Sequence, residues 1–231
     1  MNLSRLLRNC VAKEGAREQS PLLSPLQRLR QRTDSDQSGL FVAEQQACAA
    51  AMTLARQWGE RHRRGECGVV VACGGRFDEL IESMVSDFRR VPFNDLLAME
   101  AAVDSRTVAI ILEPMQGDSV VTPASHAYVQ GVERLCRELN ILLILHETRG
   151  TRGQSGGLFC EDTYNVRADI LVLGDYSSCS PRCSALLARG HACTAEIEEL
   201  QGYVHEPISR PTPVAPPAKA LRQPVPTGLM A

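Results

Sequence analysis

Short apolar runs recur along this chain, and turn residues or polar residues bound each of them. The clearest runs lie at residues 68–72, 107–112, 141–145 and 169–173, where Val, Ile and Leu dominate. A strand that is exposed on one face alternates apolar and polar residues, whereas an unbroken run is typical of a strand buried on both faces. These four runs therefore predict the central strands of a mostly parallel sheet.

The segment 125–139 has the spacing of a helix rather than of a strand. It places four apolar side chains on one face, with Arg and Glu on the other: Tyr128, Val132, Leu135 and Leu139. It lies between the runs 107–112 and 141–145, so the three segments form a strand–helix–strand unit. We expect the helix to pack on one face of the sheet, in a three-layer α/β domain.

Weaker patterns extend this outline on both sides of the central unit. Helices are expected over residues 22–32, 43–64, 76–88, 95–103 and 196–200, and short strands over 40–42, 91–93 and 184–187. Residues 33–39 are polar and predict a turn.

Polar residues follow two of the predicted central strands. Glu-Pro-Met-Gln-Gly-Asp at 113–118 follows the strand at 107–112, and His-Glu-Thr-Arg at 146–149 follows the strand at 141–145. Ligands of open parallel sheets bind beyond the carboxyl ends of the strands. These two segments are therefore the candidate site.

The same segments resemble the class III pyridoxal-phosphate aminotransferases, in particular the acetylornithine and succinylornithine branch. The family has ILEPVQGEGG and LLIFDEVQTGVGRTG, and this chain has ILEPMQGDSV and LLILHETRGTRGQSG. The resemblance runs from about residue 24 to residue 187 and is most specific over 107–173. It implies the large domain of a pyridoxal-phosphate-dependent transferase, a link to arginine and ornithine metabolism, and a dimer.

Pyridoxal chemistry needs a lysine for the Schiff base, and this lysine is absent from the expected position. In the family it follows the strand that matches residues 170–173, and here that position is Asp175. The sequence contains only two lysines, Lys13 and Lys219, both outside the segment that resembles the enzymes. No lysine near the matching strand can replace the missing one.

Other cofactor contacts of the family are altered too. The carboxylate that holds the ring nitrogen is replaced by His146, and the glutamine that contacts the ring hydroxyl is replaced by Arg149. The phosphate-binding turn becomes Ala43-Glu44-Gln45, which puts a carboxylate where a phosphate would bind, and Cys73 replaces the aromatic ring that stacks on the pyridine. Glu44 has a simpler interpretation, as a favourable acidic residue in the first turn of a helix. Glu113 and Gln116 match the family, so a degenerate pocket is expected.

Composition indicates an ordinary globular protein. The 231 residues carry a net charge of −2, with 44% apolar and 23% charged residues. This gives no electrostatic reason to expect nucleic acid or membrane as a partner. No apolar run approaches the roughly 20 residues of a membrane-spanning helix, and the first 20 residues lack the core of a secretion signal. A cytoplasmic location is the default expectation.

Nine cysteines are scattered along the chain. Free, buried thiols in a reducing compartment are the expected state. A zinc site formed by Cys179, Cys183, His191 and Cys193 is an alternative, although the paired Cys-x-x-Cys spacing of structural zinc sites is missing. We expect no metal.

The expected organisation is an N-terminal segment at 1–20, an aminotransferase-like large domain at 21–206 and a proline-rich, disordered tail at 207–231. The family's enzymes are longer, so the chain is expected to be a truncated form without the small domain that closes over the substrate.

Three functions remain open from the sequence. The first is a catalytically inactive homologue that acts by binding, as a homodimer or as a heterodimer with an active aminotransferase, without pyridoxal phosphate. The second is residual pyridoxal-dependent transamination, or another reaction in which His146, Glu147 and Asp175 transfer protons. The third is a decayed gene product with no role of its own.

Overall fold

A computed structural model describes residues 25–72, 87–117, 121–147, 159–174 and 183–203. Within these residues, seven strands form one sheet in the order β1-β9-β8-β7-β4-β2-β3. The strands are β1 (Gln37–Phe41), β2 (Gly68–Ala72), β3 (Phe88–Val91), β4 (Thr107–Leu112), β7 (Leu142–Glu147), β8 (Ile170–Leu173) and β9 (Ser184–Ala188). Strands β3, β2, β4, β7 and β8 run parallel, while β9 is antiparallel to both of its neighbours. The prediction of a mostly parallel sheet is confirmed.

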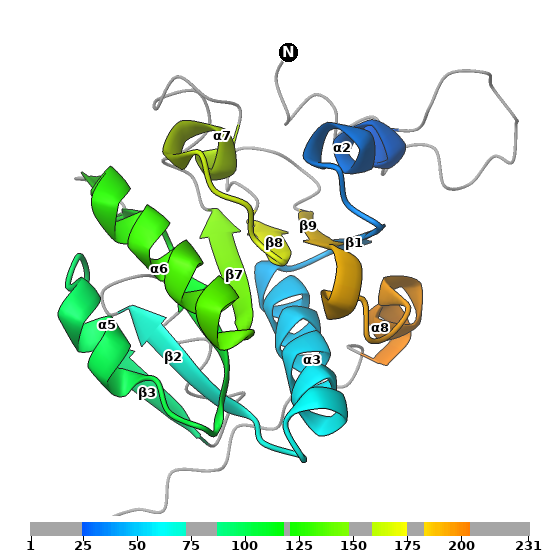
Figure 1. Cartoon of the computed structure of the whole chain (residues 1–231). Helices are drawn as coiled ribbons and strands as arrows, with labels where there is room; N and C mark the ends of the chain where they lie inside the picture. The colour runs from blue at the N-terminus through cyan, green and yellow to red at the C-terminus, as the bar shows by residue number, and fades with distance from the viewer. Residues whose placement is uncertain (1–24, 73–86, 118–120, 148–158, 175–182, 204–231) are drawn as a thin grey trace, which may run out of the picture.

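Helices cover both faces of this sheet, which gives the three layers expected from the sequence (Figure 1). One core contains side chains of α5 (Leu96–Ala102), α6 (His126–Leu139) and α7 (Cys160–Tyr164) and of the sheet face beneath them. The second core contains side chains of α3 (Glu44–His62) and α8 (Ile197–Tyr203) and of the other sheet face. The helix α2 (Pro25–Thr33), the 3₁₀ helix η1 (Gly190–Ala192) and a two-stranded hairpin of β5 (Met115–Gln116) and β6 (Thr122–Pro123) complete the fold.

Side-chain alternation along the buried strands assigns residues to the two cores. In β7, Leu143 and Leu145 belong to the core under α6, while Leu142 and Ile144 belong to the core under α3. Since successive side chains of a strand point to opposite faces, His146 lies on the α3 side and Glu147 on the α6 side. This alternation decides which helix each polar residue at the strand end can meet.

Helix α6 begins and ends at residues suited to those positions. The Ser125 hydroxyl accepts a hydrogen bond from the Tyr128 amide at 3.2 Å, and Asn140 ends the helix in a left-handed conformation with φ of 50°. The expected apolar face is correct at Tyr128 and Val132 but wrong at Leu139, which is 43% exposed. Leu139 is the last residue of the helix, directly before the turn at Asn140 that leads into β7.

Two edge strands differ from the prediction. Residues 37–39 were expected to form a turn, but they pair with β9 as part of β1, with Gln37 opposite Ala188. Strand β3 covers Phe88–Val91 rather than residues 91–93. Both strands lie at an edge of the sheet and have polar residues facing solvent, so they lack the apolar run of a central strand.

Candidate functional site

The carboxyl ends of β4 and β7 meet the amino end of α3, and polar residues from all three elements come together there. His146 is fully buried near the end of β7. Glu113 follows β4 and is 3% exposed. Glu44 is the first residue of α3, and its side chain is 16% exposed. The chain thus brings one imidazole and two carboxylates from distant segments to one point.

The imidazole of His146 lies between the two carboxylates. Its Nε2 atom is 2.7 Å from Oε1 of Glu44, within hydrogen-bonding distance. Its Nδ1 atom is 3.9 Å from Oε2 of Glu113. A neutral histidine can donate from one nitrogen only, whereas a protonated histidine can donate from both. The closer of the two contacts is the one between Nε2 and Glu44.

Glu44 also packs against the end of β8. A Cβ atom added to Gly174 would lie 2.9 Å from Oε1 of Glu44, closer than real Cβ contacts. The Gly174 amide donates to the Glu147 carbonyl at 2.8 Å, which keeps this backbone close to β7. Residue 174 must therefore be glycine for the Glu44 carboxylate to occupy its observed place.

Glu147 points to the opposite face of the sheet from His146. Its Oε1 atom accepts a hydrogen bond from the Cys160 amide at 2.6 Å, at the start of α7. The side chain is fully buried. Glu147 therefore fixes α7 to the sheet and lies apart from the pair formed by Glu44 and His146.

The segment after Glu113 is held by α7. The Tyr164 hydroxyl lies 3.3 Å from the Pro114 carbonyl and 3.1 Å from the Ala124 carbonyl. Burial raises the pKa of Tyr164 to about 12, so its hydroxyl stays a donor at neutral pH. Gln116 is buried in β5, and Gly117 has φ of 102°, a conformation that favours glycine.

The surroundings of Glu44 and Glu113 are electrostatically negative. Burial raises the pKa of the Cys48 thiol well above its ordinary value, and the carboxylates of Glu44 and Glu113 raise it further. Cys48 is one helical turn after Glu44 on α3, a spacing visible in the sequence. Sequence reasoning nevertheless missed Cys48, and it missed Gly174 because neither residue type marks a site by itself.

The other predicted site residues are placed in part. Ala43 precedes α3 with an extended backbone, and Gln45 is exposed on its first turn. Cys73, Arg149 and Asp175 lie outside the described residues. So does Cys179 of the alternative zinc set. Among the residues that the structure describes, no three His, Cys, Asp or Glu side chains are grouped so as to hold a metal ion. In the same residues, no helix is long and apolar enough to cross a membrane.

This chain is similar in sequence to known aminotransferases. Residues 78–179 match the family described as aminotransferase class-III. Acetylornithine aminotransferase 2 of Bordetella pertussis is 30% identical over 188 residues, which cover 75% of this chain and 48% of that protein. Acetylornithine aminotransferase of Neisseria meningitidis serogroup A is 35% identical over 159 residues, covering 62% of this chain and 40% of that protein.

The fold agrees with the sequence comparison. The ornithine delta-aminotransferase of Plasmodium falciparum superposes with a TM-score of 0.67 and 25% identity, over 83% of this chain and 51% of that one. This chain therefore spans about half the length, or less, of the relatives that it matches. By its matched segment and by its fold, the chain belongs to the class III aminotransferase family.

Proposed function

We propose that this chain is a non-catalytic homologue of acetylornithine aminotransferases that acts by binding another protein rather than by transamination. The observation that carries the proposal is the contact between Glu44 and His146, 2.7 Å from oxygen to nitrogen. These residues replace the phosphate-binding turn and the ring-nitrogen carboxylate of the family. The two altered residues therefore contact each other at the place where the family binds its cofactor.

Pyridoxal phosphate does not fit the residues described at this site. A phosphate dianion at the start of α3 would meet the Glu44 carboxylate, which is a like charge in a partly buried position. His146 cannot supply the negative charge that keeps a pyridine ring protonated. The nearby carboxylate of Glu113 is already directed at His146, 3.9 Å away.

Covalent capture of the cofactor also lacks its lysine. Both lysines of the sequence, Lys13 and Lys219, lie outside the segment that matches the family. Position 175, which follows Gly174 at the end of β8, is an aspartate. An aspartate cannot form an imine, so the usual route to transamination is missing.

Acid–base chemistry by His146, Glu113 and Glu44 is the weaker alternative. The imidazole of His146 is fully buried, and the Glu113 side chain is only 2% exposed. Of the three side chains only Glu44 reaches solvent in part, with 16% exposed. A group that transfers protons to a substrate must come within hydrogen-bonding reach of that substrate. The side chains of His146 and Glu113 are buried and cannot do so.

A role in binding would use the surface beside the site. Val42, directly before Ala43, is 69% exposed and so offers an apolar side chain at the surface. Resemblance to the family implies a dimer formed through the large domain. We therefore propose that the chain pairs with itself or with an active aminotransferase of the same family.

Borohydride trapping tests the non-catalytic part of the proposal. The full chain is mixed with pyridoxal phosphate, reduced, digested and mapped by mass spectrometry. We expect no labelled peptide within residues 24–187, because this segment has no ε-amine, and any label should map to Lys13, Lys219 or the α-amino group. A label within 24–187, or transamination of acetylornithine by the unmodified chain alone, would refute it.

Sedimentation tests the binding part separately. The chain is analysed alone and mixed with an active acetylornithine aminotransferase, next to the Val42→Asp variant. We expect a dimer or a mixed complex with the unmodified chain and a weaker one with the variant, since a charge at an apolar contact is costly. A monomer in both experiments would contradict the binding role and would leave the trapping result unaffected.

A further inference from the structure

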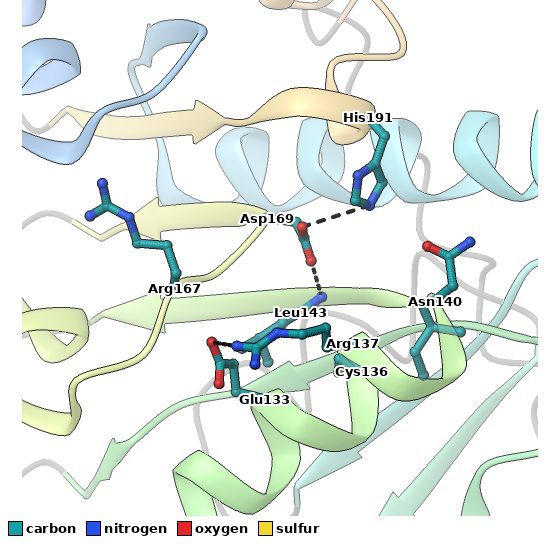
Figure 2. A pocket seen from close by; sticks show the side chains of 9 residues that line it. Glu133, Cys136, Arg137, Asn140, Leu143, Arg167, Asp169 and His191 are labelled. Atoms are coloured by element: carbon teal, nitrogen blue, oxygen red, sulfur yellow. Dashed lines mark hydrogen bonds and ion pairs between the residues drawn. The ribbon is translucent and has the colours of Figure 1, made fainter.

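A separate cavity lies at the amino ends of the central strands, whereas the site around His146 lies at their carboxyl ends. It has a volume of about 130 Å³ and is formed at the amino ends of β7 and β8, the carboxyl end of α6 and η1 (Figure 2). Its lining residue Leu143 is three positions before His146 on β7, a distance of roughly 10 Å along the strand. This cavity is therefore independent of the function proposed for the site at the carboxyl ends of the strands.

Charges of both signs line the cavity. Glu133 and Arg137 come from α6, Arg167 and Asp169 from the segment between α7 and β8, and His191 from η1. Figure 2 shows the Asp169 carboxylate in the middle, with the His191 ring on one side of it and the Leu143 amide on the other. With two carboxylates, two guanidinium groups and one imidazole, the lining is close to neutral.

Asp169 is the most restrained of these charges. Its Oδ2 atom accepts a hydrogen bond from the Leu143 amide at 2.8 Å, and its Oδ1 atom lies 3.7 Å from Nε2 of His191. Burial raises the pKa of Asp169, although the Leu143 amide, His191 and Arg189 act against the rise. The Asp169 carboxylate, whose side chain is 27% exposed, thus lacks full compensation, and a cation placed in the cavity would stabilise its ionised form.

Both arginines take part in ion pairs and have exposed guanidinium side chains. Arg137 contacts Glu133 at 2.5 Å, and the side chains of that pair are 69% and 15% exposed. Arg167 contacts Asp34 at 3.4 Å, and the side chains of that pair are 47% and 90% exposed. Exposed pairs contribute roughly 0–1 kcal/mol, so either guanidinium can turn toward a ligand at little cost.

We propose that this cavity binds a small free α-amino acid as its zwitterion, with the ammonium group at Asp169 and the carboxylate at Arg137 and Arg167. A simple anion would meet the arginines but also the carboxylates of Asp169 and Glu133. A simple cation would meet the two carboxylates but also the guanidinium groups of Arg137 and Arg167. A zwitterion satisfies both signs, and the volume is well below the roughly 300–1,000 Å³ of sites for drug-sized ligands.

Amide NMR spectra of the full chain, titrated with glycine, test this proposal. We expect binding with a dissociation constant on the order of millimolar, as suits a ligand of so few atoms. The Leu143 amide, which donates to Asp169, should shift, and the Cys160 amide near the other edge should not. Acetate and methylammonium at equal ionic strength should each bind about tenfold more weakly, because each lacks one charged contact.

Variants locate the ligand. Arg137→Gln and Arg167→Gln should each weaken glycine binding about tenfold, while Arg134→Gln on the exposed face of α6, outside the cavity, should leave it unchanged. Asp169→Asn should weaken it similarly, and the two arginine variants serve if this one fails to fold. Acetate or methylammonium binding as tightly as glycine, an equal effect of Arg134→Gln, or no shift up to about 100 mM glycine would overturn the proposal.

Discussion

Arg189 holds Glu161 through two parallel hydrogen bonds, from Nη1 to Oε1 at 2.7 Å and from Nη2 to Oε2 at 2.8 Å. Arg189 follows β9 and Glu161 lies in α7, so the pair joins the antiparallel strand to a helix on the α6 side of the sheet. The Glu161 side chain is 3% exposed, and its Oε1 atom also accepts from the Ala168 amide at 2.7 Å. Arg189 donates further to the Thr33 carbonyl at 3.0 Å, which adds α2 to the group.

Removing one partner of this pair should destabilise the fold strongly. Arg189→Met leaves the Glu161 carboxylate buried without its cation, and we expect a loss of about 3–5 kcal/mol in the free energy of unfolding. Arg32→Met is the control, since Arg32 contacts Asp162 of the same helix at 2.8 Å but with side chains 51% and 28% exposed. The loss caused by Arg32→Met should stay below about 1 kcal/mol in urea denaturation at pH 7.

A second change distinguishes a buried charge from lost packing. Adding Glu161→Gln to Arg189→Met should recover part of the stability, because a neutral amide costs less to bury and its oxygen can still accept from Ala168. No recovery in the double variant would show that the loss comes from the arginine side chain's packing alone.

The pair of Glu44 and His146 should contribute measurably to stability. Glu44→Ala removes the acceptor 2.7 Å from Nε2 of a fully buried ring, and we expect a loss of about 1–3 kcal/mol in denaturation experiments. Gln45→Ala, on the same helical turn but exposed, is the matched control and should change stability by no more than about 0.5 kcal/mol. Equal effects of the two variants would contradict the importance of this contact.

Glu44 and His146 should also be coupled in a double-mutant cycle. His146→Asp alone brings a third carboxylate between Glu44 and Glu113, so it should destabilise the protein. Glu44→Gly in the same chain should cost less than the sum of the two single changes, because it relieves that repulsion. Additive effects in urea denaturation would show that the two residues do not act as a pair.

Restoring the family's residues should restore trapping of the cofactor. The triple variant Glu44→Gly, His146→Asp, Asp175→Lys provides an ε-amine, a ring-nitrogen carboxylate and an uncharged phosphate turn. We expect pyridoxal phosphate to become trapped by borohydride at position 175, measured by peptide mapping, without efficient turnover. Asp175→Lys alone should trap less, and equal trapping would show that Glu44 and His146 do not exclude the cofactor.

Asp169 and Asp104 should give opposite pH dependences. Since the native pKa of Asp169 is raised, its contribution to stability falls as the pH rises above about 4, the usual value of an unfolded aspartate. Asp169→Asn should remove this loss, so the variant should gain stability relative to the unmodified chain as the pH increases from about 4 to 7. Its amide oxygen can still accept from Leu143.

For Asp104, removal from water raises the pKa, but the Arg106 amide and the Arg89 guanidinium outweigh it and lower the pKa to about 2. Its contribution is present above about pH 4 and is lost as the pH falls toward 2. Asp104→Asn should therefore lose stability relative to the unmodified chain as the pH rises from about 2 to 4, and this difference should stay constant from about pH 4 to 7, where Asp169→Asn gains stability. Parallel pH profiles of the two variants in denaturation experiments would contradict the assigned directions.

The central strands could be predicted from the sequence. Unbroken runs at Gly68–Ala72 and Thr107–Leu112 have one stable arrangement, because both faces of such strands must be covered. The edge strands β1 and β3 could not be placed correctly, since a strand paired on one side needs no apolar run. The assignment of Asp175 to the family's lysine position stays a prediction from the linear sequence.

Only the tertiary structure decided how the altered residues relate to one another. The sequence indicated that Glu44 starts a helix and that His146 ends a strand, but their 2.7 Å contact depends on how α3 packs against β7. Likewise, the cavity at the amino ends of β7 and β8 brings together side chains from three separate segments: Asp169, Arg137 and His191. Local patterns follow from backbone geometry and burial, whereas side-chain partners depend on packing between segments distant in the chain.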